Sequence, residues 1–351
     1  MRSPTPVDHT HSVIPDPAKI PVARQGDQPF IAADVGGTHA RVGLVRVGAD
    51  GKVDVLQYQR YACAEYPSLA AILDHFAAAS SAERTHAVVA IAGRLEGDTL
   101  INSNLQWPVS VQRTREAAGI THLALLNDFE AVACAMSYVD AATMTRVCGP
   151  VGAGNGPALV LGPGTGFGAA LCLRSALQQR APLRVLASEA GHAALAASTT
   201  RELDLVRVLL QRWPHVDNER VLSGPGLVNT YAALCELDGV TPRLDNPEAI
   251  AAAAQSGGDA RAVETLQLFC ALLGSLAGDL AVTFGADSVY LAGGIPAQIR
   301  PFLLDSEFAA RFRNKGVLGE VLARVPVWLV DHGQLGLVGA AAWYYERHSG
   351  Y

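Results

Sequence analysis

The sequence lacks the marks of several protein classes. Its six cysteines form no CxxC pair and lie in apolar contexts, so we expect reduced, buried thiols. No continuous apolar stretch reaches bilayer length, so we expect no transmembrane helix and no membrane partner. Basic residues are not in excess, because 27 Lys and Arg stand against 33 Asp and Glu, which argues against nucleic acid as a partner. These absences favour a cytoplasmic protein.

The N-terminal segment differs in composition from the rest of the chain. Residues 1–28 are rich in Pro, Asp, His and Ser and lack the apolar region of a signal peptide, so we expect a disordered extension. With 351 residues, of which 50% are hydrophobic, the chain is long enough for two domains that each have a core.

The segment 30–45 is the most informative one. It reads as an apolar strand, an acidic residue, a glycine turn and a second apolar run. Gly36 and Gly37 let the backbone approach a ligand closely, and the N–H groups of such a turn form an anion-binding concavity. Asp34, just before the turn, can help to hold Mg²⁺, which prefers carboxylate, water and phosphate oxygens. The pattern is typical of a site for the phosphates of ATP.

The same pattern returns more than a hundred residues later. The apolar run 158–161 leads into the glycine turn Gly162–Gly168, and another apolar run follows. Two such units predict two related half-domains that face each other across a nucleotide. Strands come first and then alternate with helices, which favours an α/β sheet with a meander at one end. Beyond residue 190 the pattern predicts helices at 199–212, 224–237, 247–256, 260–285 and 335–347.

Asp128 stands where the predicted strand 122–126 gives way to a helix. Active residues often occupy this place in open α/β sheets, and a carboxylate here can accept the proton of a substrate hydroxyl in phosphoryl transfer. Asp also caps helices, which is the better interpretation for Asp128 taken alone. Asn127 shifts the balance slightly towards function, because an adjacent amide and carboxylate suit a pair of sugar hydroxyls.

Three further polar residues are candidates. Glu189 and His192 have a spacing that places both on one side of a helical turn, where they suit a polyhydroxy ligand. One His and one Glu are too few to identify a metal site, and an ordinary surface pair fits equally well. Glu219 precedes a loop and helix start at Ser223, so it is either a substrate ligand or a solvated charge. Gly293–Gly294 follows a strand and is either a close-approach turn for adenine or ribose, or a strand exit.

A nicotinamide-dependent enzyme is the alternative that the motifs leave open. Gly164–Ala169 matches the G-x-G-x-x-A dinucleotide pattern, and Glu189 lies twenty residues further on. Its position in the middle of the chain argues against this interpretation, which also leaves the turn after Asp34 unexplained.

From about residue 29 to 347 the sequence resembles bacterial glucokinases, of the hexokinase and actin-like ATPase group. The shared motifs are Asp34–Thr38, Leu126–Phe129, Gly162–Gly166, Glu189–His192, Glu219–Asn229, Leu291–Ile295 and Gly336–Ala340. The resemblance implies a smaller and a larger α/β domain of the RNase H-like type, closing over a cleft. They would span 29–138, completed by the C-terminal helix 335–351, and 139–334. It also implies transfer of the γ-phosphoryl group of ATP to the 6-hydroxyl of glucose, with Mg²⁺, commonly in a homodimer.

Roles follow from the resemblance position by position. Asp128 would be the general base. The groups that bind glucose would be Asn104, Asn127, Asp128, Glu189, His192 and Glu219. The groups that hold the nucleotide would be Gly36, Gly37, Thr38, Gly164, Thr165, Gly166, Gly293 and Gly294. Asp34 would position Mg²⁺ through water.

Two residues depart from the family pattern. His39 stands where Asn is usual after Gly-Gly-Thr, and Arg94 stands where Pro is usual near the sugar side. No Cys lies near His192, which favours the branch without a zinc site. A sugar-binding sensor of the same fold that has lost useful catalysis is a further hypothesis consistent with these departures.

Overall fold

The computed structural model describes residues 28–48, 52–80, 82–101, 105–139, 141–152, 154, 156–173, 184–330 and 333–348. The chain divides into two compact units, one of Met1–Asp128 with Ala340–Tyr351 and one of Phe129–Gly339. The domain boundaries expected from the resemblance lie at 138 and 334, and these two units divide after Asp128 and after Gly339. Residues 1–27 of the predicted extension and Asn104 lie outside the described residues.

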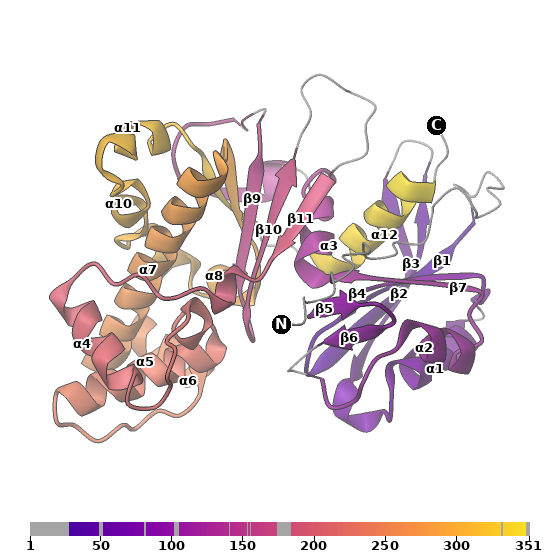
Figure 1. The fold of residues 1–351 in the computed structure, drawn as a ribbon, viewed down its shortest axis with the longest axis horizontal. Helices are drawn as coiled ribbons and strands as arrows, with labels where there is room; N and C mark the ends of the chain where they lie inside the picture. Colours follow the sequence, from indigo (N-terminus) through magenta and orange to yellow (C-terminus); the bar gives the residue numbers. More distant parts are fainter. Residues whose placement is uncertain are drawn as a thin grey trace, which may run out of the picture. The chain divides into compact units, whose positions relative to one another are not determined.

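A five-stranded sheet forms the first unit (Figure 1), in the order β3-β2-β1-β4-β7. The first three strands make an antiparallel meander, and β4 and β7 run parallel to β1. This is the predicted meander at one end of an α/β sheet. The strands are β1 (Phe30–Val35), β2 (His39–Val47), β3 (Val53–Ala62), β4 (His86–Ile91) and β7 (His122–Asn127), with a separate hairpin of β5 (Arg94–Glu96) and β6 (Thr99–Ile101).

Different helices cover the two faces of this sheet. Helices α1 (Leu69–Ser80) and α2 (Val111–Ala117) cover the face on which Ile31, Val42 and Val89 are buried. The other face receives helix α12 (Leu335–His348), whose Tyr344 ring lies 4.7 Å from the ring of Phe30, centroid to centroid. Polar side chains on that second face, near the carboxyl end of β1, belong to the candidate site.

A six-stranded sheet in the order β11-β10-β9-β12-β13-β8 forms the second unit. Its strands are β8 (Met144–Cys148), β9 (Ala158–Pro163), β10 (Phe167–Leu173), β11 (Arg184–Ser188), β12 (Ser288–Leu291) and β13 (Val327–Val330). Strands β9, β10 and β11 form an antiparallel meander, and β12 and β13 run parallel to β9. The two sheets therefore share one strand order and one set of directions over five strands, as the prediction of two related halves requires.

Helices make up the rest of the second unit. They are α3 (Asp128–Ala135), α4 (Thr200–Leu209), α5 (Gly224–Leu237), α6 (Pro247–Gln255), α7 (Ala260–Phe284), α8 (Gly294–Gln298), α9 (Arg300–Leu304), α10 (Phe308–Arg313) and α11 (Gly319–Leu322). Helix α3 packs its small residues Ala133 and Ala135 against Val160 and Ala170 of this second sheet. This packing agrees with the start of the second unit at Phe129.

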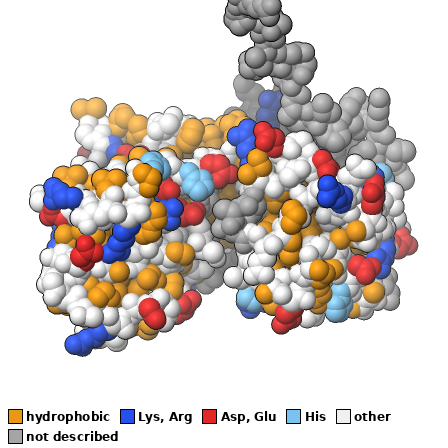
Figure 2. Space-filling model, turned by 60° about the horizontal axis from the view of Figure 1, so that its bottom comes forward, with side chains coloured by type: hydrophobic (Ala, Val, Ile, Leu, Met, Phe, Trp, Pro, Cys, Tyr) orange, Lys and Arg blue, Asp and Glu red, His pale blue; other side chains and the backbone are white. Residues whose placement is uncertain are grey.

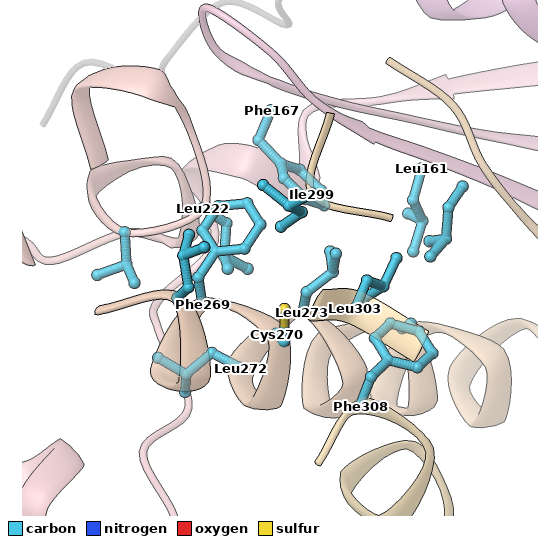
Figure 3. Close-up of a cluster of buried hydrophobic side chains, with 14 of the residues drawn as sticks. Leu161, Phe167, Leu222, Phe269, Cys270, Leu272, Leu273, Ile299, Leu303 and Phe308 are labelled. Atoms are coloured by element: carbon cyan, nitrogen blue, oxygen red, sulfur yellow. The ribbon is translucent and has the colours of Figure 1, made fainter. Parts of the chain in front are cut away.

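The long helix α7 is the centre of the larger core. Figure 3 shows Phe167, Leu222 and Ile299 directed towards its residues Phe269 and Leu273. By length and composition α7 is apolar enough to cross a membrane, and 72% of its most apolar window is buried inside the protein. It is therefore the core helix of its unit, since its apolar side chains already have protein partners.

Charged side chains of both signs are interspersed on the face shown in Figure 2. The second unit also holds ion pairs, such as Arg201 with Glu264 and Arg212 with Glu236, in which charges of opposite sign lie side by side. The charge of this face is therefore local and does not form a continuous field of one sign.

Candidate active site

The first glycine turn joins β1 to β2, and the backbone itself holds it in place. The Gly36 N–H donates to the carbonyl of His39 at 3.0 Å, and the Cys63 N–H donates to the carbonyl of Thr38 at 2.9 Å. The Cys63 thiol also donates to the carbonyl of Gly36, with Sγ and O 3.4 Å apart. Burial raises the pKa of this thiol, so it stays protonated as a donor. The turn is thus a preformed loop tied to the end of β3.

Asp34 lies one residue before the end of β1, and its side chain is 20% exposed. Burial raises the pKa of its carboxyl group, and Arg41, whose Nη1 lies 3.1 Å from Oδ2, opposes that rise. The described residues hold no group of three or more His, Cys, Asp or Glu side chains that could hold a metal ion. One carboxylate beside a phosphate turn nevertheless fits Mg²⁺, which usually keeps several waters and takes its other ligands from substrate phosphates.

Asn127 and Asp128 lie at the same edge of this sheet as the first turn. Val35, Ile91 and Asn127 are register partners on three neighbouring parallel strands, so the segments that follow them leave the sheet side by side. The Asn127 side chain donates from Nδ2 to the carbonyl of Gly93 at 3.3 Å. Asp128 is the first residue of α3, as the strand-to-helix pattern predicted. Within the first unit, the edge thus presents a phosphate turn and an amide–carboxylate pair.

The second glycine turn occupies the equivalent place between β9 and β10. The Gly164 N–H donates to the carbonyl of Gly166, and the carbonyl of Gly164 accepts the N–H of Gly224 from the start of α5, both at 2.8 Å. Gly293 follows the parallel neighbour β12, and a Cβ on it would lie 2.9 Å from the carbonyl oxygen of Pro163. The two predicted nucleotide segments of this unit, Gly164–Gly166 and Gly293–Gly294, therefore adjoin.

The nicotinamide interpretation fails at this turn. A dinucleotide fold needs a helix directly after its glycine motif, with the pyrophosphate at the helix N-terminus. Here the residues after the turn, Phe167–Leu173, form the strand β10 and pair with both β9 and β11. The match to the dinucleotide pattern is therefore confined to the sequence, and the strand–turn–helix structure that the pattern requires is not formed here.

Glu219 is bound to the second turn. Its Oε2 accepts the N–H of Phe167 at 2.8 Å. A Cβ on Gly166 would lie 2.5 Å from the same oxygen, so only glycine leaves room for the carboxylate there. The residue belongs to a short 3-10 helix, Asn218–Arg220, that Asp217 caps by accepting the N–H of Arg220 at 2.9 Å.

Glu189 and His192 lie beside that segment. Glu189 directly precedes a single 3-10 turn, Ala190–His192, and His192 is its last residue; the His192 N–H donates to the carbonyl of Glu189 at 3.0 Å. The Asn218 side chain donates from Nδ2 to the carbonyl of Ala190, also at 3.0 Å. The structure thus brings Glu189, His192 and Glu219 together with the second turn in one unit.

Two residues beside the candidate site were not identified in the sequence analysis. Asp217 places Oδ2 3.8 Å from Nδ1 of His192, and His215 Nε2 lies 3.0 Å from the carbonyl oxygen of His192. Both residues sit in the short segment before Glu219, and nothing in their spacing from His192 indicates contact. The only available signal was that a second His and an Asp directly precede a motif already identified.

Comparison with known proteins decides the family. A family model described as Glucokinase matches residues 31–347. The chain belongs to the glucokinase family. It is 47% identical over 322 residues to a "Glucokinase-like protein" of Xylella fastidiosa, a match that covers 91% of this chain and 95% of that one. A glucokinase of Stenotrophomonas maltophilia is 36% identical over 322 residues, with 90% and 95% covered.

Solved structures agree with this assignment. A crystal structure of a glucokinase from an Antarctic psychrotroph matches with a TM-score of 0.76 at 34% identity, and covers 90% of this chain and 98% of that one. The resemblance to glucokinases and the expected fold of two related α/β halves are confirmed. The roles of individual residues in this glucokinase-family chain remain proposals.

Proposed function

We propose that this protein is a glucokinase that transfers the γ-phosphoryl group of ATP to the 6-hydroxyl of glucose. One observation carries the proposal: two glycine turns occupy equivalent places in two sheets of the same strand order, and each adjoins polar side chains suited to a sugar. Such turns present backbone N–H groups to phosphate oxygens. Membership of the glucokinase family supports the same reaction.

In the proposed mechanism Asp128 accepts the proton of the glucose 6-hydroxyl as the hydroxyl oxygen attacks the γ-phosphorus in line. The bond from the γ-phosphorus to the bridging oxygen breaks, and ADP leaves with that oxygen. Asn127, Glu189, His192, Glu219 and Asn104 bind the sugar hydroxyls. The N–H groups of the two turns stabilise negative charge on the transferring group. Mg²⁺, when bound, would supply charge neutralisation at the phosphates, and Asp34 would be the carboxylate that positions it through water.

The decisive experiment compares sugars and one variant. We expect ATP-dependent phosphorylation of glucose when glucose, mannose, fructose and N-acetylglucosamine are tested, and a loss of about 10²–10⁴-fold in kcat for Asp128→Asn. The matched control is Asp54→Asn, which removes the same charge from an exposed position on β3. A normal kcat in the Asp128 variant would contradict the base assignment. Glucose binding without turnover of any sugar would identify a sensor instead.

Three finer statements belong to this proposal. Mg²⁺ dependence is contradicted if activity persists in excess chelator. A homodimer rests on the resemblance to bacterial glucokinases, and a solution mass of one chain would rule it out. A place in the cytoplasm is expected from the reduced, buried thiols, and cell fractionation tests it.

A further inference from the structure

Three side chains beside the first glycine turn form a hydrogen-bonded chain. His39 Nδ1 lies 3.1 Å from Thr38 Oγ1, and His39 Nε2 lies 3.1 Å from Arg60 Nη2. The register of β2 and β3 pairs His39 with Ala62 and Arg41 with Arg60, so His39 and Arg60 are diagonal neighbours on one face of the sheet. This is the face of Asp34 and Arg41, opposite the buried core under α1 and α2.

The chemistry of the guanidinium group decides the direction of both hydrogen bonds. A guanidinium group only donates, so Nε2 of His39 accepts and the proton of the neutral ring is on Nδ1. The Nδ1–H group then donates to Thr38 Oγ1, and the hydroxyl keeps its own proton for a different partner. Loss of hydration lowers the pKa of His39 first, and the charges of Arg60 and Arg41 lower it further, so the neutral ring is favoured.

This chain of contacts controls the direction of the Thr38 O–H group. The carbonyl of Thr38 already accepts the Cys63 N–H, and the turn is closed by the bond from the Gly36 N–H to the His39 carbonyl. The backbone of Thr38 is therefore held in place, and its remaining freedom lies in the side chain, including the rotation of the O–H group. A donor on one side of Oγ1 directs the O–H proton away from His39.

We propose that Arg60 and His39 form a relay that directs the Thr38 O–H group at a phosphate oxygen of the bound nucleotide. His39 and Arg60 are then positioning residues for the phosphoryl donor, acting through Thr38. The inference rests on the proposed ATP site at this turn. It gives a role to His39, the residue that departs from the Asn usual in the resembled family.

The first test reads the His39 tautomer and needs no catalysis. In protein labelled with ¹⁵N at histidine, the ring correlations at neutral pH should show a proton on Nδ1 and none on Nε2 of His39. Arg60→Met should mix the two tautomers and raise the measured pKa of His39. Arg46→Met is the matched control, because it removes the same charge further along β2, beside Asp54. A ring protonated on Nε2 in the unmodified protein would overturn the relay.

The second test measures Mg·ATP affinity in the absence of sugar, by calorimetry. Arg60→Met should weaken binding about 2- to 10-fold, because the Thr38 hydroxyl remains but is no longer held in one direction, whereas Arg46→Met should not. In a Thr38→Val background Arg60→Met should have no further effect, because the relay acts only through the hydroxyl. An equal effect in both backgrounds would mean that Arg60 acts directly by its charge, and would overturn the proposal.

Variants at His39 complete the test. His39→Phe keeps a ring without nitrogen and should match Arg60→Met, whereas His39→Asn keeps a donor and an acceptor and should retain more of the affinity. In steady state the KM for ATP should rise and the KM for glucose should not. If the unmodified protein phosphorylates no sugar, the proposed function fails, while the tautomer and the ATP affinities still decide the relay.

Discussion

At the scale of single residues, several side chains assigned to the site are already held by the protein. Glu219 accepts the Phe167 N–H, Asn127 donates to the Gly93 carbonyl, and Asp34 pairs with Arg41. A side chain that is fixed before the ligand arrives loses less rotamer freedom on binding. The site is therefore preorganised within each unit, and removing a group should affect binding more than folding.

Glu219→Gln separates the scaffold role of this residue from its charge. The amide retains an oxygen that can accept the Phe167 N–H, but a neutral acceptor binds a sugar hydroxyl less strongly than a carboxylate does. We expect the KM for glucose to rise about 5- to 10-fold with little change in Tm. Glu248→Gln, at an exposed position in the first turn of α6, is the control. An unchanged KM would remove Glu219 from the sugar site.

At the scale of elements, the start of α5 connects helix stability to the site. Ser223 Oγ accepts the N–H of Gly226 at 3.0 Å as the cap of α5, and its hydroxyl donates to the carbonyl of Glu219 at 2.7 Å. The carbonyl of Gly164 also accepts the Gly224 N–H from the same helix start. One helix terminus thus holds both the second turn and the segment that carries Glu219.

Two cap variants distinguish these roles. Ser223→Ala and Asn246→Ala each remove an N-cap, of α5 and α6 respectively, and each should cost about 1 kcal/mol or more of stability. Only Ser223→Ala should also raise the KM for glucose, because only Ser223 bonds to Glu219. Calorimetry and steady-state kinetics on both variants measure this. Equal kinetic effects would show that the cap of α5 has no special connection to the site.

At the scale of the whole molecule, the two halves repeat one plan with different additions. Both sheets place an antiparallel meander beside two parallel strands, and both put a glycine turn after the first strand of the meander. The second half adds the helices α4 to α7 and a larger apolar core. Several ionisable groups are buried or half-buried in the two units, and they contribute to the pH dependence of stability.

Stability should fall at alkaline pH. Burial raises the pKa of Cys148 to about 11 and that of Cys270 to about 12, from a reference of 9.0, and raises the pKa of Tyr231 and Tyr344 to about 12 from 10.0. The unfolded chain loses the thiol protons above about pH 9 and the tyrosine protons above about pH 10, while the folded chain keeps them to higher pH, so rising pH favours unfolding. We expect calorimetric Tm to decline from pH 9 to 11, and less steeply in Cys148→Ala. A flat profile would contradict the burial of these groups.

The sequence by itself determined the local elements and the chemistry of the turns. The helix 224–237 was predicted with the bounds that α5 has, because apolar period and helix-start signals act within a few residues. The glycine turns and the strand-to-helix place of Asp128 follow from the same short-range signals. Family membership of the chain was also readable from these motifs.

Only the tertiary structure decided which distant residues meet. The ring of Phe129 packs where a Cβ on Gly162 or Gly168 would overlap it, so these glycines serve packing as well as a turn. The contacts of His39 with Arg60 and of His192 with Asp217 likewise join residues 21 and 25 positions apart. Alternation along a strand predicts the face on which a side chain lies, whereas its neighbour depends on strand register and loop path. Strand register and loop path are set by the packing of the whole unit, and no local sequence pattern specifies them.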